Sequence, residues 1–523
     1  MSDGSVQRQR QEQPAVPVLR EQRVGEILAA VPERSQWRYR PRRAGHLVWR
    51  SRTFRVVAVF TLLALCGVVI LALVRDETGT EGFLVGLGLA VLPVPVLMTA
   101  FRWLDRVDPG PWRNLLFAFA WGACAAALVA IIANSFATRW IATADPGNAD
   151  TLGATVIAPV VEESAKAAAV LLLFLFRGRQ FTGIVSGVVA AGFTATGFAF
   201  TENILYLGNA FGEDQQLGSG FAAVTVMTFL VRAVMTPFAH PLFTVLTGIG
   251  LGIAASSPPH RRFRRVAAPL LGLLLAMGMH SLWNGSPTFG RYGFYVVYGL
   301  FMVPVFGLVT WLAVRSRRNE LRTLAVELPV YAEAGWLPPA EPLTLASMRA
   351  RALARNAARR RYEVAVRPYG GHHPAHAASS APAAARERGR AAARTVAEYE
   401  AFATSLAFLR RQVRRGTADP DFAARELELL HHLWQRRDVA GPALAYAAQV
   451  TQRVRARRAA PPPGPYPWYG ARGPTGPYGP GPYAYPAQPY GPGAHGQQPY
   501  AYQPYAQPPY TAPQQTGSPD VGG

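Results

Sequence analysis

The stretch TLGATVIAPVVEESAKAAAVLLLFLF, residues 151–176, is apolar along almost its whole length except for three charged side chains. It is long enough for a helix to cross the hydrocarbon core of a bilayer, which takes about 20 residues for about 30 Å. Glu162, Glu163 and Lys166 lie in its middle, and Lys166 is the only lysine in the sequence. Because ionisable groups are costly inside a bilayer, their presence in a predicted span favours a functional role.

The sequence around this stretch has the pattern of a membrane protein with many spans. Long apolar runs dominate from about residue 54 to residue 316. We therefore predict an all-α polytopic membrane protein with about eight transmembrane helices. The region 221–255 is too long for one straight crossing, and Pro237 and Pro241 favour either a kink or a split into two pieces. The predicted spans are 54–75, 82–104, 114–136, 152–176, 181–209, 221–255, 265–285 and 292–316.

The charges of the loops predict how these spans are oriented. Arginine-rich loops, such as RWLDRVDPGPWR (102–113) and SSPPHRRFRR (256–265), alternate with loops that are mostly acidic or neutral. The positive-inside rule then places both termini in the cytoplasm, in agreement with an even number of spans. The formal net charge of +22 fits basic loops beside anionic lipid better than nucleic-acid binding. Arginine in place of lysine, with much Ala, Pro and Gly, points to a bacterial source with a high GC content. The expected location is the plasma membrane.

Composition divides the chain into four regions. A basic segment, 1–53, precedes the membrane domain 54–316. An Arg/Ala-rich region, 317–458, has helical apolar spacing and is expected to form a cytoplasmic helical module near membrane lipids, with a linker at 370–390. Residues 459–523 are rich in Pro, Tyr and Gly and cannot bury a core, so we predict a disordered tail that recruits a partner or acts as a spacer.

Helical spacing and depth bring polar groups of several spans toward one place. Glu162 and Lys166 are four residues apart and can form an ion pair, whereas Glu163 points about 100° around the helix, toward a cavity. Glu202, His240 and His280 lie in later predicted spans. With the predicted orientation, these groups lie at mid-membrane or in the outer half. They could therefore meet in one pocket that opens toward the outside.

These residue types can hydrolyse a peptide bond in two ways. Two imidazoles and one or more carboxylates can bind zinc and leave a position open for water. His240 and His280 are the only two of the ten histidines within predicted spans. A further glutamate can then act as general base while water attacks a carbonyl. The same groups can also activate water without a metal, and the sequence does not separate these two mechanisms.

Four motifs resemble a known family when they are taken in order along the apolar helices. EESAK, FAFTEN, the segment around His240 and HSLWN are similar to the motifs of the PrsW family of intramembrane proteases, a relative of the CAAX prenyl endopeptidases. The turn at LDRVDPGPW (104–112) also fits the family pattern, and the resemblance covers about residues 55–316. It implies cleavage of a single-pass, membrane-anchored substrate, such as an anti-sigma factor, on its extracytoplasmic side, with zinc as the expected metal.

Individual residues of this sequence also have expected roles. Arg232 either contacts the substrate or an oxyanion, or extends to the outer interface as long basic side chains often do. The residues implied as catalytic are Glu162, Glu163, Lys166 and Glu202. The implied metal ligands are His240, His280 and Glu202. The expected supporting residues are Asn203, Asn284 and Arg232, which follow from their positions in the predicted spans.

Other classes of function stay open at this point. Acids and histidines inside spans also relay protons, so a proton-coupled transporter is one alternative. Many transporters contain internal repeats, and the two halves of the membrane domain show no convincing similarity. A non-catalytic membrane scaffold for the cytoplasmic extension is another. In the simplest alternative, the buried charges only pair with one another between helices.

Overall fold

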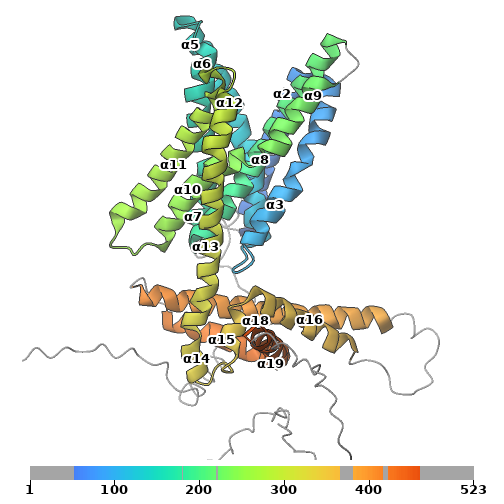
Figure 1. Cartoon of the computed structure of the whole chain (residues 1–523), viewed down its shortest axis with the longest axis vertical. Helices are drawn as coiled ribbons and strands as arrows, with labels where there is room; N and C mark the ends of the chain where they lie inside the picture. Colours follow the sequence, from blue (N-terminus) through green and yellow to red (C-terminus); the bar gives the residue numbers. More distant parts are fainter. Residues whose placement is uncertain (1–51, 179–180, 219–221, 365–380, 416–421, 460–523) are drawn as a thin grey trace, which may run out of the picture. The chain divides into compact units, whose positions relative to one another are not determined.

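The computed structural model describes residues 52–178, 181–218, 222–364, 381–415 and 422–459 (Figure 1). These residues form helices and contain no strand, so the predicted all-α fold class is confirmed for them. The tail from residue 460 onward and residues 1–51 lie outside them. The elements of the membrane domain are α2 (Arg52–Val91), α3 (Pro93–Leu104), α4 (Trp112–Ala120), η1 (Trp121–Ala126), α5 (Ala127–Ala144), α6 (Ala149–Leu152), η2 (Gly153–Ile157), α7 (Ala158–Phe176), α8 (Ile184–Leu217), α9 (Ala223–Phe229), η4 (Leu230–Met235), α10 (Ala239–Ser256), α11 (Arg262–Asn284), η5 (Ser286–Phe289), α12 (Gly293–Val296), η6 (Val297–Met302) and α13 (Val303–Glu327).

Six helical stretches of the described residues are long and apolar enough to cross a membrane. The first, Val56–Leu104, has 49 residues, or about 74 Å of helix, which is more than twice the thickness of the hydrocarbon core. Gly79 interrupts it with a φ of 73° and a ψ of 168°, a conformation that glycine tolerates best. The charged helix α7 is not one of the six stretches. A total of eight spans therefore stays a prediction.

The region predicted as one long span at 221–255 consists of two helical pieces. The first is α9, continued by the π-helical turn η4, and the second is α10. Between them, Thr236–Phe238 is not helical. Pro237 lies in this break, and Pro241 lies in the first turn of α10, where a missing N–H costs no intrahelical hydrogen bond. The break brings His240 to the start of a helix in the interior of the bundle.

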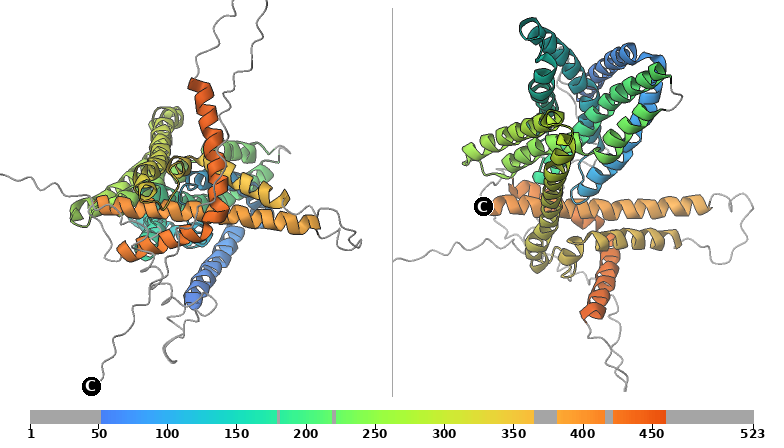
Figure 2. Two further views of the ribbon diagram at one scale, coloured as in Figure 1. Left: turned by 90° about the horizontal axis from the view of Figure 1, so that it is seen from below. Right: turned by 45° about the horizontal axis from the view of Figure 1, so that its top comes forward.

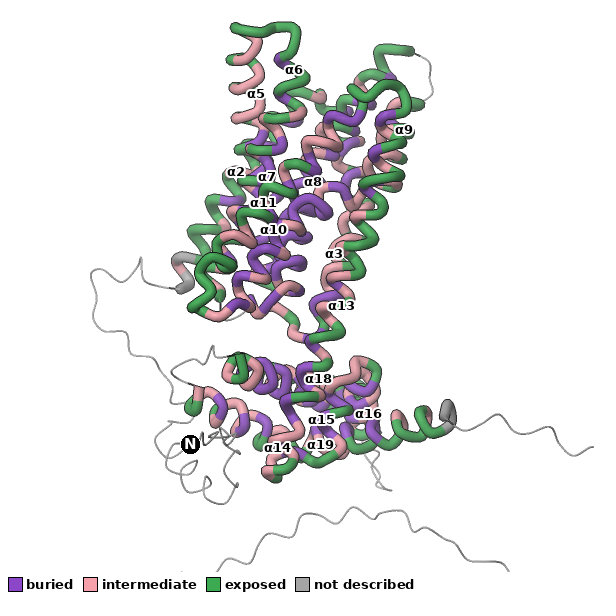
Figure 3. The backbone as a smooth tube through the Cα atoms, turned by 60° about the vertical axis from the view of Figure 1, so that its left-hand side comes forward, coloured by how far each residue is buried: buried purple, intermediate pink, exposed green. Residues whose placement is uncertain are grey.

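Helix α8 is the central helix of the membrane domain and packs against α2, α4 and α10. It is buried along most of its length, as Figure 3 shows. Glycines permit this close packing: a Cβ added at Gly187 would lie 2.0 Å from the carbonyl oxygen of Gly248, and one at Gly122 would lie 1.9 Å from that of Thr194. Small residues at helix interfaces let backbones approach in this way. Glu202, on α8, is therefore held on a rigid element.

The end of α13 and the helices that follow it form a separate buried core. The helices that follow are α14 (Pro329–Glu333), α15 (Glu341–Leu345), α16 (Met348–Val364), α18 (Ala381–Arg414) and α19 (Phe422–Ala459). Leu324 of α13, Tyr331 and Tyr399 lie in this core, and α16 runs alongside α18 (Figure 2). The linker prediction is wrong for residues 381–390, which belong to α18, because their alanines and arginines favour a helix.

Candidate active site

Helix α7 presents the charged residues of EESAK inside the helix bundle. Glu162, Glu163 and Lys166 are 7%, 0% and 0% exposed. Lys166 Nζ donates hydrogen bonds to Glu163 Oε1 at 2.9 Å and to Glu162 Oε2 at 3.2 Å. One lysine reaches both carboxylates because residues three and four positions apart share a helix face. The expectation that Glu163 points away from this pair into a cavity is therefore wrong.

Glu163 is held by side chains from three helices. In addition to Lys166, His280 Nδ1 of α11 lies 3.2 Å from Glu163 Oε1. Thr244 of α10 donates its hydroxyl to Glu163 Oε2 at 2.8 Å. Both carboxylate oxygens are thus hydrogen-bonded and shielded from solvent. This geometry suits a residue that orients the imidazole of His280.

Glu162 makes looser contacts than its neighbour. Asn134 Nδ2, from α5, lies 3.4 Å from Glu162 Oε1. His280 Nε2 lies 3.9 Å from Glu162 Oε2, and a separation of this size between polar groups can be bridged by water. Of the paired glutamates, Glu162 is therefore the better placed to hold a water molecule.

A second cluster of polar groups comes from α8, η4 and α10. Glu202 Oε2 lies 2.5 Å from His240 Nε2 and 2.8 Å from Arg232 Nη2. Arg232 Nε donates a hydrogen bond to Asn203 Oδ1 at 2.9 Å. The predicted residues Glu202, Asn203, Arg232 and His240 thus come together. The guanidinium of Arg232 is engaged with these side chains and does not extend away to the interface.

Lys166 joins the two clusters. Its Nζ lies 3.2 Å from His240 Nδ1 and 3.7 Å from the centroid of the Phe198 ring. An ammonium is a compact point charge, whereas a guanidinium is a wide planar fork that cannot fit the same contacts. This provides a physical reason for the single lysine in a chain that otherwise uses arginine. Six of the predicted residues, Glu162, Glu163, Lys166, Glu202, His240 and His280, therefore form one connected network.

Three of these residues could hold a metal ion. Glu162, His240 and His280 offer ligand atoms that all lie within 4.8 Å of one another. Two imidazole nitrogens and one carboxylate oxygen make up the donor set of many catalytic zinc sites, so the residues fit zinc. The ammonium of Lys166 touches two of these ligands and would have to move away from them. Glu202, predicted as a ligand, is outside this set because its Oε2 contacts His240 and Arg232.

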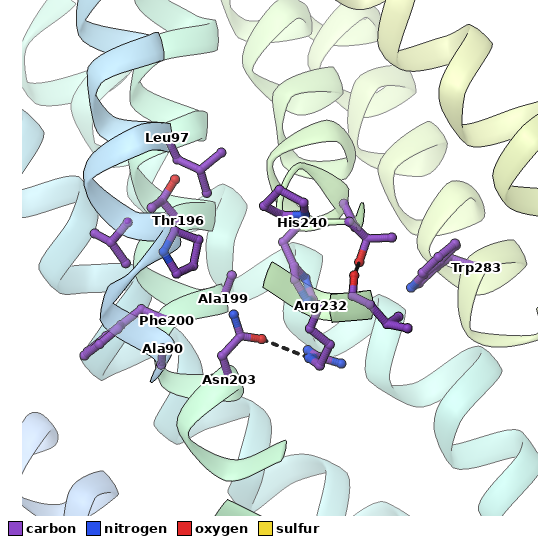
Figure 4. A pocket seen from close by; sticks show the side chains of 15 residues that line it. Ala90, Leu97, Thr196, Ala199, Phe200, Asn203, Arg232, His240 and Trp283 are labelled. Atoms are coloured by element: carbon purple, nitrogen blue, oxygen red, sulfur yellow. Dashed lines mark hydrogen bonds between the residues drawn. The ribbon is translucent and has the colours of Figure 1, made fainter. Parts of the chain in front are cut away.

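A cavity of about 60 Å³ borders the second cluster, which is large enough for water. Asn203, Arg232 and His240 line it on one side (Figure 4). Apolar residues of α2 and α3, among them Ala90 and Leu97, line the other side. A substrate group entering this cavity would meet polar side chains on one wall and an apolar helix surface on the other.

Several residues that hold this site together were not among those predicted from the sequence. Thr244 lies one helical turn after His240, so its position on the same face was a usable signal. Asn134 is a polar side chain in the apolar predicted span 114–136, which was a weaker signal. Trp121 donates its indole N–H to the carbonyl oxygen of Ala165 on α7 at 2.9 Å. Spacing alone gives no indication of a contact between an indole and a distant backbone carbonyl.

Asn284 lies outside the network in the structure. Its Nδ2 donates a hydrogen bond to the carbonyl oxygen of Ala154 at 2.9 Å. This contact links the end of α11 to η2, and it involves none of the paired glutamates or the two buried histidines. Asn284 therefore supports the packing of the helix that carries His280.

Comparisons with known proteins agree with the position of this network. The model of the PrsW family, described as intramembrane metalloproteases, matches residues 110–309. The chain is 27% identical over 227 residues to Protease PrsW of Geobacillus kaustophilus (strain HTA426), which covers 43% of this chain and 88% of that protein. It is 27% identical over 161 residues to Protease PrsW of Clostridioides difficile (strain 630), which covers 31% of this chain and 62% of that protein. No solved structure matches.

Proposed function

Because the membrane domain of this chain belongs to the PrsW family of intramembrane proteases, we propose that it hydrolyses a peptide bond with water activated at Glu162. The observation that carries this proposal is the contrast between the paired glutamates. Glu163 is fully buried and accepts hydrogen bonds of 2.9 and 2.8 Å on its two oxygens. The hydrogen bonds to Glu162 are longer, 3.2 Å from Lys166 and 3.4 Å from Asn134, and its Oε2 lies 3.9 Å from His280 Nε2. A water molecule can bridge polar groups at the separation between Glu162 and His280.

The reaction follows from the groups around that water. Glu162 accepts a proton from the water while its oxygen attacks the carbonyl carbon of the scissile bond. His280 orients the water through Nε2, because its Nδ1 is fixed by Glu163. When the tetrahedral intermediate collapses, the C–N bond breaks and the amine nitrogen takes up the proton that Glu162 received. Without a metal, Lys166 contacts both carboxylates and offsets part of their negative charge.

Zinc is the metal that we propose for this site. His240, His280 and one oxygen of Glu162 would hold it, and bound zinc would lower the pKa of a water to about 7. The proton of the water would then pass to the oxygen of Glu162 that does not bind the metal. Zinc content of the purified protein, measured by mass spectrometry of the metal, tests this part. We expect about one zinc per chain in the wild type and much less in His280→Ala. A wild type that is free of zinc and fully active would contradict it.

We propose that the cut lies on the extracytoplasmic side of the membrane. His280 is four residues from the end of α11, and His240 is at the start of α10. With both termini in the cytoplasm, as the arginine-rich loops predict, these helix ends face outward. The proposed substrate is a single-pass membrane protein such as an anti-sigma factor.

The relatives and the exposed apolar side chains support a proposal about the membrane in which this protein resides. The relatives come from the bacteria Geobacillus and Clostridioides, and we propose that this multi-pass protein resides in a bacterial plasma membrane. The exposed apolar side chains of α2, α11 and α13 fit contact with lipid tails. Fusion of a reporter to either terminus tests the orientation, since only a cytoplasmic terminus would carry an active cytoplasmic reporter.

Mass spectrometry of membrane-protein N-termini tests the activity directly. Cells carrying the wild type are compared with cells carrying Glu162→Gln, which keeps the shape of the side chain and removes the general base. We expect N-termini just outside the membrane that are present in the wild type and missing in the variant. They would also identify the substrate.

The matched control is Glu333→Gln, which changes another glutamate outside the network. Its pattern of N-termini should equal that of the wild type. Identical patterns for the wild type and Glu162→Gln under several envelope stresses, with both proteins inserted in the membrane, would contradict the proposed function.

A further inference from the structure

Arg232 is a cationic side chain with three different contacts inside the membrane domain. Its Nη2 lies 2.8 Å from Glu202 Oε2, and its Nε donates to Asn203 Oδ1 at 2.9 Å. Its guanidinium carbon lies 3.8 Å from the centroid of the Tyr206 ring. A guanidinium suits such a site because it combines an ion pair, a second hydrogen bond and stacking on an aromatic face. All three partners lie on α8, which is the rigid centre of the bundle.

The backbone of η4 explains how Arg232 reaches this position. Leu230–Met235 is π-helical, and the N–H of Thr236 bonds the carbonyl oxygen of Val231 at 2.9 Å, five residues back. The chain then leaves the helix before His240. In a straight α-helix, Arg232 and His240 would be about 12 Å apart along the axis. The π-turn and the break instead bring both side chains to the same oxygen of Glu202. Single π-turns within helices are frequent at functional sites.

Glu202, which is held by Arg232, in turn contacts the imidazole of His240. Its Oε2 lies 2.5 Å from His240 Nε2, so the other ring nitrogen, Nδ1, points toward Lys166 at 3.2 Å. A carboxylate on one imidazole nitrogen fixes the tautomer and the orientation of the ring. Glu163 acts in the same way on His280. Each of the two histidines therefore has its own carboxylate, and the carboxylate of His240 is in turn held by an arginine.

We infer that Arg232 is a positioning residue, which holds Glu202 in place and thereby orients the imidazole of His240 toward the centre of the site. This inference rests on the proposed function. It gives Glu202 the role of an orienting carboxylate, in place of a metal ligand. It also gives Arg232 a role other than contact with an oxyanion, since its Nη2 and Nε already bind Glu202 and Asn203.

A double-mutant cycle separates this role from others. It uses Arg232→Gln, Glu202→Gln and the double variant, with the substrate identified from the cellular map of N-termini and the full-length protein in liposomes. If Arg232 acts through Glu202, the double variant is no slower than the slower single variant, because coupled residues are not additive. We expect Arg232→Gln to lower kcat between about tenfold and 100-fold with KM changed less than about twofold.

Two further variants complete the test. Arg232→Lys keeps the positive charge and loses the planar fork, so it should recover part of the activity lost in Arg232→Gln. Arg139→Gln changes an arginine that is exposed at the end of α5 and should behave as the wild type. Thermal unfolding of the same variants gives the stability coupling between Arg232 and Glu202 without any activity measurement.

The outcomes distinguish this inference from the proposed function. Losses of kcat that multiply in the double variant, or a rise in KM alone, would overturn the role of Arg232. Stability coupling without a loss of kcat would overturn it as well, since the pair would then be only structural. A wild-type protein that cleaves no faster than Glu162→Gln would instead overturn the proposed function itself.

Discussion

Both the membrane domain and the helical extension bury charged residues, but they use them differently. In the extension, Tyr399 donates its hydroxyl to Glu341 at 2.6 Å, and Arg355 pairs with Glu400. Each of these contacts joins one side chain of one helix to one side chain of another helix. In the membrane domain, the single ammonium group of Lys166 contacts two glutamates and a histidine. Buried charge as such does not identify a site, whereas convergence of several groups beside a cavity does.

The two regions also differ in what surrounds the carboxylates. Glu341 is 3% exposed, and burial raises its pKa to about 7, although the hydrogen bond from Tyr399 lowers it. Its protonated form is therefore well populated near neutral pH, which suits a structural contact. In the membrane network, cationic and imidazole groups face every carboxylate. If this difference separates catalysis from stability, variants of the two regions should differ in what they lose.

The largest effect should come from removing the histidine shared by the paired glutamates. His280→Ala removes the partner of Glu163 and one of the three possible metal ligands. We expect cleavage to fall between about 100-fold and 10,000-fold, the range for loss of acid–base or metal-ligand groups. The rate of cleavage in liposomes measures it. The control, His260→Ala, changes an exposed loop histidine and should keep full activity; a similar loss there would show a general effect on folding.

A smaller effect is expected for the hydroxyl that fixes Glu163. Thr244→Val keeps the shape of the side chain and removes the hydrogen bond to Glu163 Oε2. Loss of a hydrogen bond to a charged group costs about 2 kcal/mol, so cleavage should fall about tenfold to thirtyfold and the melting temperature should fall as well. Kinetics and thermal unfolding of one preparation measure both. Thr247→Val, which changes a buried threonine of the same helix, is the control, and equal losses in both variants would contradict a role through Glu163.

The extension should respond to pH in a way that leaves cleavage unchanged. Since the pKa of Glu341 is raised from 4.5 to about 7, the folded state binds more protons than the unfolded state between these values. The stability of the extension should therefore fall as the pH rises from about 4.5 to about 7. Glu341→Gln removes this loss and should stabilise the extension at pH 8 by up to about 3 kcal/mol, with little effect at pH 4.

Hydrogen exchange of the full-length protein checks this prediction. Peptides from α15 and α18 of Glu341→Gln should exchange more slowly than those of the wild type at pH 8 and equally fast at pH 4. Cleavage should stay within about twofold of the wild type. A loss of activity comparable to that of His280→Ala would erase the distinction between the two regions.

The smallest effect is expected at Asn284. Its amide bonds only the backbone carbonyl of Ala154, at an exposed position. Asn284→Ala should therefore lower the rate of cleavage less than about threefold, since exposed hydrogen bonds contribute about 1 kcal/mol or less. A loss of 100-fold in the same liposome assay would show that Asn284 takes part in the network, as the motif HSLWN alone suggests.

The sequence predicts well where the helices lie along the chain. It predicts less well which side chains of each helix face which neighbouring helix. Backbone groups must be hydrogen-bonded within a bilayer, so an apolar run of sufficient length implies a helix. The six charged and imidazole residues of the network could be named for the same reason, because such groups are costly in apolar spans. Which glutamate is enclosed depends on Thr244 and His280 from other helices, and no spacing within EESAK encodes these neighbours. The π-turn at Leu230–Met235 also gives no signal in the sequence, because its residues apart from Arg232 are ordinary apolar ones.

One measurement tests the central claim, that water is activated at Glu162 and that Glu163 only orients His280. Single-turnover cleavage and thermal unfolding are compared for Glu162→Gln and Glu163→Gln in liposomes with the identified substrate. We predict that Glu162→Gln binds substrate, loses cleavage by at least about 100-fold and unfolds at the wild-type temperature or above. Glu163→Gln should lose both activity and stability, because it leaves buried partners unpaired. Cleavage that survives in Glu162→Gln, while Glu163→Gln is folded and inactive, would contradict the account.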